Sequence, residues 1–124
     1  MYGTVSRLQA QINLTIYSAN QSEIEIECVI DTGFEGFLTL PVSIVETLEL
    51  PYFMDIKANL ADDSNVKTDV HLATILWSGV DRVVPVLALD RRSLLGTALL
   101  QDLNLNIDFY EGGSVVLDDL NFYV

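Results

Sequence analysis

The chain has 124 residues, half of them hydrophobic, with 18 acidic side chains against 6 lysines and arginines and a formal net charge of -12. This length and composition predict one folded domain over residues 1–124 that can bury a core without disulfides or metal. The negative charge disfavours nucleic acid and anionic membranes as partners, because both would repel the chain. No apolar stretch approaches the roughly 20 residues of a spanning helix and no signal-peptide pattern opens the sequence, so we expect a cytoplasmic protein.

Two alternating segments come first in the chain. Apolar and polar residues alternate from Leu8 to Tyr17 and again from Glu23 to Ile30, which is the period of strands with one buried face. The polar run 18–22 between them predicts an antiparallel hairpin. Cys28, the single cysteine, falls on the apolar side of the second segment and is expected in the core. The inward positions of the first segment are expected to be Leu8, Ala10, Ile12, Leu14 and Ile16.

The middle of the chain predicts a short strand, a helix and a second hairpin. Residues 37–40 are compatible with a short strand, and Pro41 can open a helix as its first residue. Alternation then covers residues 56–61 and 66–76. The turn-forming run Asp62-Asp63-Ser64-Asn65 separates these two stretches, which predicts a long hairpin.

The last third of the chain predicts a buried strand, a short helix and a final hairpin. The strand is expected over residues 83–89, after a turn at 78–81, and its Pro85 indicates an edge or a bulge. Thr97 is the expected N-cap of a helix that runs through Leu103. The final hairpin is expected to pair residues 105–109 with 114–117. Many short strands with two short helices predict an all-β fold, a small closed or partly closed barrel.

Asp31-Thr32-Gly33 lies where the second alternating segment ends, in the stretch CVIDTGFEGF. Taken alone, the triplet has an ordinary interpretation as an Asx-type turn in which Gly33 takes backbone angles that side chains disfavour. Its context is more specific. It follows a hairpin, precedes a helix and a second hairpin tipped by residues 60–64, and is followed later by Leu94-Leu95-Gly96 before another helix.

This order of motifs resembles the retropepsin-like aspartic proteases, specifically their short bacterial single-lobed members, over about Leu8 to Leu117. The resemblance implies that Asp31 is catalytic and that Thr32 and Gly33 complete the active-site loop, with the Gly33 amide facing the carboxylates. It also implies a packing role beneath this loop for Leu94, Leu95 and Gly96. The flap that closes over substrate would be formed by Leu60, Ala61, Asp62, Asp63 and Ser64.

Peptide hydrolysis by carboxylates needs two of them that share a proton, because one deprotonates the attacking water while the other polarises the carbonyl. One Asp-Thr-Gly supplies half of this pair, so we expect a homodimer in which the two Asp31 side chains meet on a two-fold axis. By resemblance, the Thr32 hydroxyls hydrogen-bond across the dimer. The substrate would be an extended peptide or protein segment added as a strand between loop and flap, and no metal or other cofactor is implied.

Four residues, at three places in the chain, depart from the family pattern and leave another function open. Phe34 stands where a small residue is common, Thr97-Ala98 where retroviral members usually have arginine and an acidic or amide residue, and Asp63 where bacterial relatives commonly have glycine. Phe34 and Thr97 favour, as the alternative, a catalytically weak or inactive module of the same fold that binds peptides or dimerises. A third interpretation is a plain β-barrel interaction domain in which the triplet occurs by chance.

Overall fold

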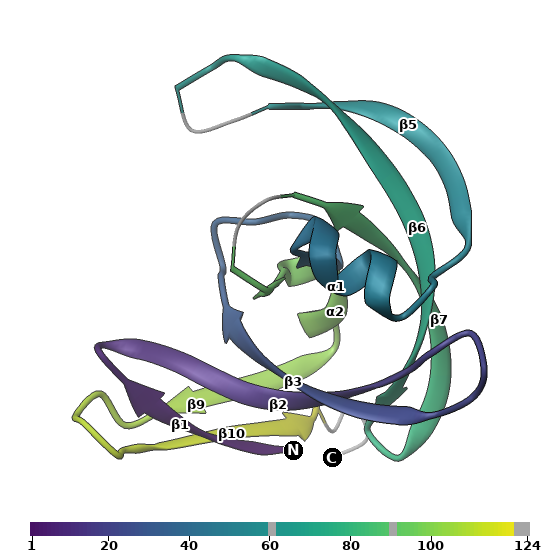
Figure 1. Ribbon diagram of the computed structural model, residues 1–124. Helices are drawn as coiled ribbons and strands as arrows, with labels where there is room; N and C mark the ends of the chain where they lie inside the picture. The colour runs from purple at the N-terminus through teal and green to yellow at the C-terminus, as the bar shows by residue number, and fades with distance from the viewer. Residues whose placement is uncertain (60–61, 90–91, 121–124) are drawn as a thin grey trace.

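The computed structural model describes residues 1–59, 62–89 and 92–120, which form a strongly curved sheet with two short helices (Figure 1). This confirms the all-β class expected from the sequence. The elements in chain order are β1 (Tyr2–Ser6), β2 (Gln9–Tyr17), β3 (Glu23–Ile30), β4 (Leu38–Leu40), α1 (Val42–Thr47), β5 (Tyr52–Asn59), β6 (Asn65–Trp77), β7 (Val80–Ala88), β8 (Leu94–Leu95), α2 (Thr97–Leu100), β9 (Leu103–Ile107) and β10 (Ser114–Asp119).

The strands of the described ranges belong to one sheet in the order β5-β6-β7-β4-β8-β3-β2-β1-β10-β9. Strand β6 also pairs with β2, opposite residues 16 and 17, so the sheet curls back on itself. Strands β6, β7, β4, β8, β3 and β2 therefore close into a ring, as the expected closed or partly closed arrangement requires. Three hairpins predicted from alternation and turn residues are confirmed: β2–β3, β5–β6 and β9–β10.

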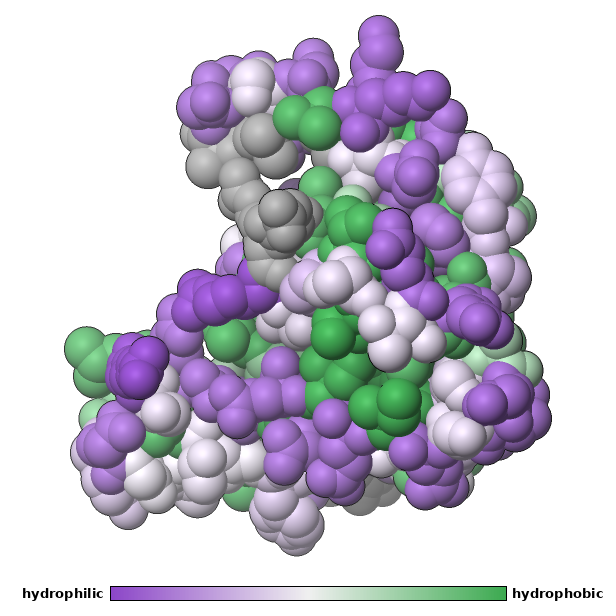
Figure 2. Space-filling view, in the orientation of Figure 1, coloured by the Kyte–Doolittle hydropathy of each residue, from purple (hydrophilic) through white to green (hydrophobic). Residues whose placement is uncertain are grey.

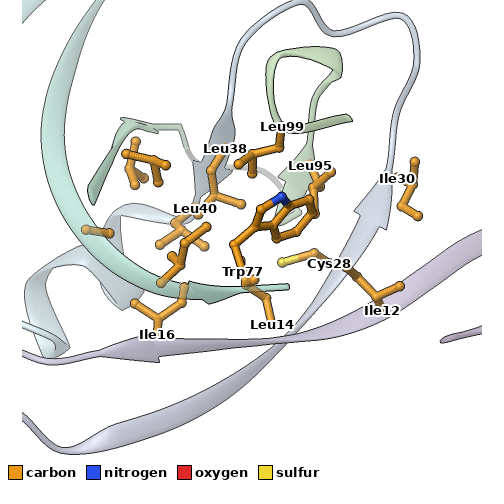
Figure 3. Close-up of a cluster of buried hydrophobic side chains, with 14 of the residues drawn as sticks. Ile12, Leu14, Ile16, Cys28, Ile30, Leu38, Leu40, Trp77, Leu95 and Leu99 are labelled. Atoms are coloured by element: carbon orange, nitrogen blue, oxygen red, sulfur yellow. The ribbon is translucent and has the colours of Figure 1, made fainter. Parts of the chain in front are cut away.

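The interior of this ring is apolar because alternating strands turn one face inward. Figure 3 shows side chains of β2, β3, β4, β8 and α2 meeting around Trp77, which β6 contributes. Cys28 is fully buried here, as expected. Burial, with a smaller contribution from the charge of Glu27, raises the pKa of the Cys28 thiol to about 12. The thiol therefore stays protonated at neutral pH and is a core residue rather than a nucleophile.

The first inward position expected from the sequence is wrong. Leu8 is 77% exposed and lies in the turn between β1 and β2, where both Arg7 and Leu8 have positive φ. The sequence did not predict strand β1, because its polar residues leave no clear alternation of apolar and polar positions. Its Gly3 is required by close packing, since an added Cβ would lie 1.9 Å from the carbonyl oxygen of Gln11 on β2.

Both predicted helix starts are displaced by one residue. Pro41 is the N-cap of α1 rather than its first residue, since its ψ of 145° is not helical. Gly96, not Thr97, is the N-cap of α2. The Thr97 hydroxyl donates instead to the carbonyl oxygen of Phe34, at 3.3 Å. Helix α2 also ends before Leu103, which begins β9 rather than closing the helix.

Strands β5 and β7 begin earlier than the sequence suggests, so Val80 and Asp81 belong to β7 and not to the preceding turn. Pro85 of β7 lies opposite Leu72 of β6. On its other side β7 pairs with β4 only from Val86 onward. Pro85 therefore stands where β7 has one unpaired edge, in agreement with the expected edge position.

Leu14→Ala is expected to lower the free energy of unfolding by about 2–5 kcal/mol, because it empties a fully buried site. Leu8→Ala is the control, since the sequence places both leucines on one strand face whereas Leu8 is exposed. We expect that control to change the free energy of unfolding by less than about 0.5 kcal/mol. Urea denaturation measures both, and similar losses for the two variants would contradict the described turn at Leu8.

Candidate active site

Asp31 directly follows β3 and is fixed by backbone and side-chain hydrogen bonds. Its amide donates to the carbonyl oxygen of Leu95 on β8, at 2.9 Å, and its own carbonyl oxygen accepts from the Phe34 amide, at 3.1 Å. Its Oδ1 accepts a hydrogen bond from the Gly33 amide, at 2.9 Å. The carboxyl of Asp31 is partly exposed and Thr32 and Gly33 are exposed, so this turn presents an oriented carboxylate at the surface.

The hydrogen bond between the Gly33 amide and Asp31 Oδ1 fits both interpretations of the triplet. This hydrogen bond defines an Asx-type turn, which is common at strand ends. It also makes the Gly33 amide face the carboxyl group of Asp31. A backbone donor aimed at a carboxyl group holds one of its oxygens in place.

The base of the Asp31 loop is closed by β8. This two-residue strand lies between β3, which leads into the loop, and β4, which follows it. Leu95 is opposite Ile30 in the parallel pair with β3 and opposite Leu38 in the antiparallel pair with β4. Its side chain is fully buried, so β8 is anchored in the core directly below the loop (Figure 3).

Thr39 also holds this arrangement together, although nothing in the sequence analysis singled it out. It is 2% exposed on β4, its hydroxyl donates to the carbonyl oxygen of Arg92 at 3.2 Å, and the hydroxyl oxygen accepts from the Leu94 amide at 3.0 Å. A buried hydroxyl needs such partners to offset the cost of its desolvation. The signal available in the sequence was a hydroxyl residue between two leucines of a short apolar strand.

The Phe34 side chain packs against two glycines. A Cβ added to Gly36 would lie 2.5 Å from Phe34 Cζ, and one added to Gly96 would lie 2.6 Å from Phe34 Cδ2. Phe34 also accepts hydrogen bonds through its carbonyl oxygen from the Thr97 amide, at 2.8 Å, and from the Thr97 hydroxyl. The two departures from the family pattern on either side of this loop, Phe34 and Thr97, are therefore direct partners.

The hairpin β5–β6 carries the residues that the resemblance assigns to the flap. Leu60 and Ala61 lie outside the described residues. At the turn, Asp62 Oδ1 accepts hydrogen bonds from the amide and the hydroxyl of Ser64, at 3.0 and 2.6 Å. Asp63 has a φ of 64°, a left-handed conformation that favours glycine and that aspartate tolerates better than most residues.

The tip of the β5–β6 hairpin and the end of β3 lie on the same side of the molecule, on the left in Figure 1. The surface is hollowed on this side below the hairpin in Figure 2. The structure thus brings together Asp31, the loop after it and the packing residues Leu95 and Gly96 by direct contacts. The turn residues Asp62, Asp63 and Ser64, which the resemblance assigns to a flap, belong to a separate projection on the same side.

Two solved structures share this arrangement of strands. EIAV protease complexed with the inhibitor HBY-793 matches with a TM-score of 0.57 over 77% of this chain and 88% of its own, at 21% sequence identity. A retropepsin-like aspartic protease from Rickettsia conorii matches with a TM-score of 0.52 over 98% of this chain and 92% of its own, at 14% identity. The chain has the retropepsin fold. No family model and no curated protein matches the sequence.

The resemblance inferred from the Asp31 motif is thus confirmed at the level of the fold. Within this retropepsin fold, the described residues contain no group of three or more His, Cys, Asp or Glu side chains that could hold a metal ion. None of the helices in the described ranges has the length and apolar character needed to cross a membrane.

The β5–β6 hairpin of this retropepsin fold carries a cluster of titratable side chains. Asp55 lies directly opposite Asp69 in the β5–β6 register. The Tyr52 hydroxyl donates to Asp55 Oδ1 at 2.7 Å, and Lys67 Nζ is 3.0 Å from Asp55 Oδ2. These hydrogen bonds, led by that of Tyr52 and joined by one with Asp69, lower the pKa of Asp55 to about 2. His71 packs edge-on against the Tyr52 ring.

The pKa of Asp69 shifts in the opposite direction. Its hydrogen bond with Asp55 is the largest cause that raises the pKa of Asp69, followed by desolvation and the charge of Asp55. The raised pKa means that the folded hairpin holds the Asp69 proton more tightly than the unfolded chain does. The stabilisation from this proton is present below the ordinary carboxyl pKa of about 3.9 and is lost as pH rises through the raised value.

Asp69→Asn is expected to raise thermal stability at pH 7 and to have a smaller effect at pH 4. At pH 7 the substitution removes repulsion with Asp55, and the new amide can donate to Asp55, whereas at pH 4 part of Asp69 is already protonated. Asp118→Asn makes the same charge change opposite the neutral Asn104 and serves as the control. Thermal unfolding at both pH values measures the effect, and an equal gain at pH 4 and pH 7 would contradict it.

Proposed function

We propose that this protein is an aspartic endopeptidase that acts as a homodimer, with one Asp31 from each chain. The observation that carries the proposal is the oriented Asp31 carboxyl, held by the Gly33 amide above a loop closed by β8, in a chain with the retropepsin fold. One such carboxyl is half of the acid–base pair that peptide hydrolysis requires. A second copy of the chain is the simplest source of the other half.

In the proposed dimer the two Asp31 carboxyls share one proton. The ionised carboxylate takes a proton from the attacking water, while the protonated carboxyl donates a hydrogen bond to the scissile carbonyl and its proton later serves the leaving nitrogen. Like charges about 3 Å apart cannot both be ionised at low cost, so the pair titrates with two separated apparent pKa values. No covalent intermediate and no cofactor takes part in this scheme.

The surrounding residues have supporting roles in the proposal. The Gly33 amide keeps Asp31 Oδ1 in place, and the exposed Thr32 hydroxyls bridge the two loops of the dimer. The hairpin tipped by residues 60–64 closes over an extended peptide or protein substrate, which gains main-chain hydrogen bonds as an added strand. Leu94, Leu95 and Gly96 support the loop from below. In this proposal the reaction takes place in the cytoplasm.

A second candidate function keeps the fold without efficient catalysis. Thr97 stands where retroviral members usually have arginine, and its hydroxyl and amide are both used by the Phe34 carbonyl oxygen. The contact between Phe34 and Thr97 therefore replaces the usual family residues close to Asp31, the proposed catalytic residue. Under this alternative the protein binds extended peptides or dimerises, and Asp31 is a turn residue.

Asp31→Asn is expected to abolish cleavage of peptide and unfolded-protein libraries between pH 3 and 7, with a loss of about 10⁴-fold or more. The substitution removes the shared proton chemistry but can keep an oxygen acceptor for the Gly33 amide, so folding should be retained. Asp118→Asn, on β10, is the matched control and should cleave as the wild type does. Equal background turnover by wild type and Asp31→Asn, while both dimerise, would favour the peptide-binding module.

Added salt and mild acid are both expected to strengthen the dimer. Each chain carries a formal net charge of -12, so association brings two strongly negative molecules together. Salt shortens the range of this repulsion and acid reduces the charge itself. Sedimentation equilibrium across a series of NaCl concentrations and of pH values measures the dissociation constant. A constant that changes with neither variable would refute this expectation.

A further inference from the structure

Phe34 closes a cycle of backbone hydrogen bonds around the candidate catalytic residue. Its amide donates to the carbonyl oxygen of Asp31 at 3.1 Å, and its carbonyl oxygen accepts from the Thr97 amide at 2.8 Å. Thr97 lies two residues after Leu95, whose carbonyl oxygen accepts from the Asp31 amide at 2.9 Å. The loop that carries Asp31 is therefore linked at both ends to the segment formed by β8 and the start of α2.

The Phe34 ring occupies space that two glycines leave open. All three heavy atoms nearest to a Cβ added to Gly36 belong to the Phe34 ring, at 2.5, 2.7 and 3.5 Å. A Cβ added to Gly96 would meet Phe34 Cδ2 at 2.6 Å, but also the Gly36 carbonyl oxygen at 2.1 Å. The φ of Gly96 is -99°, which any residue can adopt, so the requirement there is one of space. A large side chain at position 34 thus matches the glycines at positions 36 and 96.

We infer that Phe34 is a positioning residue for Asp31, and not a wall of the substrate pocket. Its ring, seated on Gly36 and Gly96, fixes the Asp31 loop relative to the first turn of α2. The catalytic consequence rests on the proposed function, because two Asp31 carboxyls can share a proton only when both loops hold them at hydrogen-bond distance. A displacement of about 1 Å in such a site can cost on the order of 100-fold in rate.

A double-mutant cycle tests the packing independently of any activity. Gly36→Ala is expected to lower the urea midpoint of the wild type, because the new methyl overlaps the Phe34 ring. In a Phe34→Ala background the same Gly36→Ala change should cost little, since the overlapping atoms are gone. Gly96→Ala is the control that Phe34→Ala should not rescue, because the Gly36 carbonyl oxygen remains. Additive losses for Phe34→Ala and Gly36→Ala would overturn the proposed packing.

Kinetics of Phe34→Ala and Phe34→Leu test the positioning role. We expect Phe34→Ala to lower kcat by about 10- to 100-fold while KM changes less than about twofold, since the substrate contacts are kept. The two apparent pKa values of the kcat profile should move closer together, because the carboxyls of a looser pair interact less. Phe34→Leu, which refills part of the space, should recover most of the rate. A changed KM and substrate preference with kcat retained would make Phe34 a pocket wall and overturn the inference.

Amide hydrogen exchange separates failure of this inference from failure of the proposed function. If wild type and Asp31→Asn turn over substrate equally, the endopeptidase proposal fails, yet the positioning of the loop can still be measured. Phe34→Ala should then speed exchange of the Asp31, Gly33 and Thr97 amides, whose acceptors belong to the same network. Unchanged exchange at these three amides would overturn the positioning role whatever the activity.

Discussion

The insertion of β8 between β3 and β4 is the constraint on which the rest of the candidate site depends. Two residues, Leu94 and Leu95, pair with the strand that leads into the Asp31 loop and with the strand that leaves it. The buried Leu95 side chain fixes the register of both pairings, because a shift by one residue would turn it away from the core. The position of Asp31 is thereby tied to core packing and not only to its own turn.

This constraint explains why the unusual residues around the loop are compatible with one another. Thr39 supplies a buried hydroxyl that satisfies backbone groups on the β8 side, and Gly36 and Gly96 give the Phe34 ring its space. Thr97 then uses its amide and hydroxyl on the Phe34 carbonyl oxygen. Phe34 and Thr97, which depart separately from the family pattern, are therefore in direct contact in the folded protein.

Repulsion between negative charges recurs in this molecule. The formal net charge of -12 opposes association of two copies, and the Asp55–Asp69 pair places two carboxyls opposite each other on the β5–β6 hairpin. Under the proposed function a second pair of carboxyls arises, from Asp31 of each chain. Mild acid reduces the repulsion between two copies of the chain and the repulsion between Asp55 and Asp69, because bound protons neutralise some of the like charges.

The sequence by itself determined the features that depend on local pattern. The two-residue alternation predicted the strands β2, β3 and β6, the turn residues predicted the hairpins, and the Asp31 triplet at a strand end led to the correct fold. Along β6, however, the buried positions change from Thr68 and Val70 to Ala73, Ile75 and Trp77, which the alternation did not predict. Local pattern sets which face of a strand is apolar and where a chain can turn. That is enough to propose Asp31 as a functional residue.

Tertiary structure decided what depends on neighbours distant in the sequence. Leu8 fits the alternation of β2, yet it lies in a turn because β1 has to fold back to pair with β2. Thr97 has a good N-cap side chain, but its hydroxyl is used by Phe34, which lies 63 positions away. The direction of the Phe34 ring follows from space beside Gly36 and Gly96, and the place of β8 follows from pairings on both its edges. Such contacts leave no local period in the sequence, so only the folded chain could reveal them.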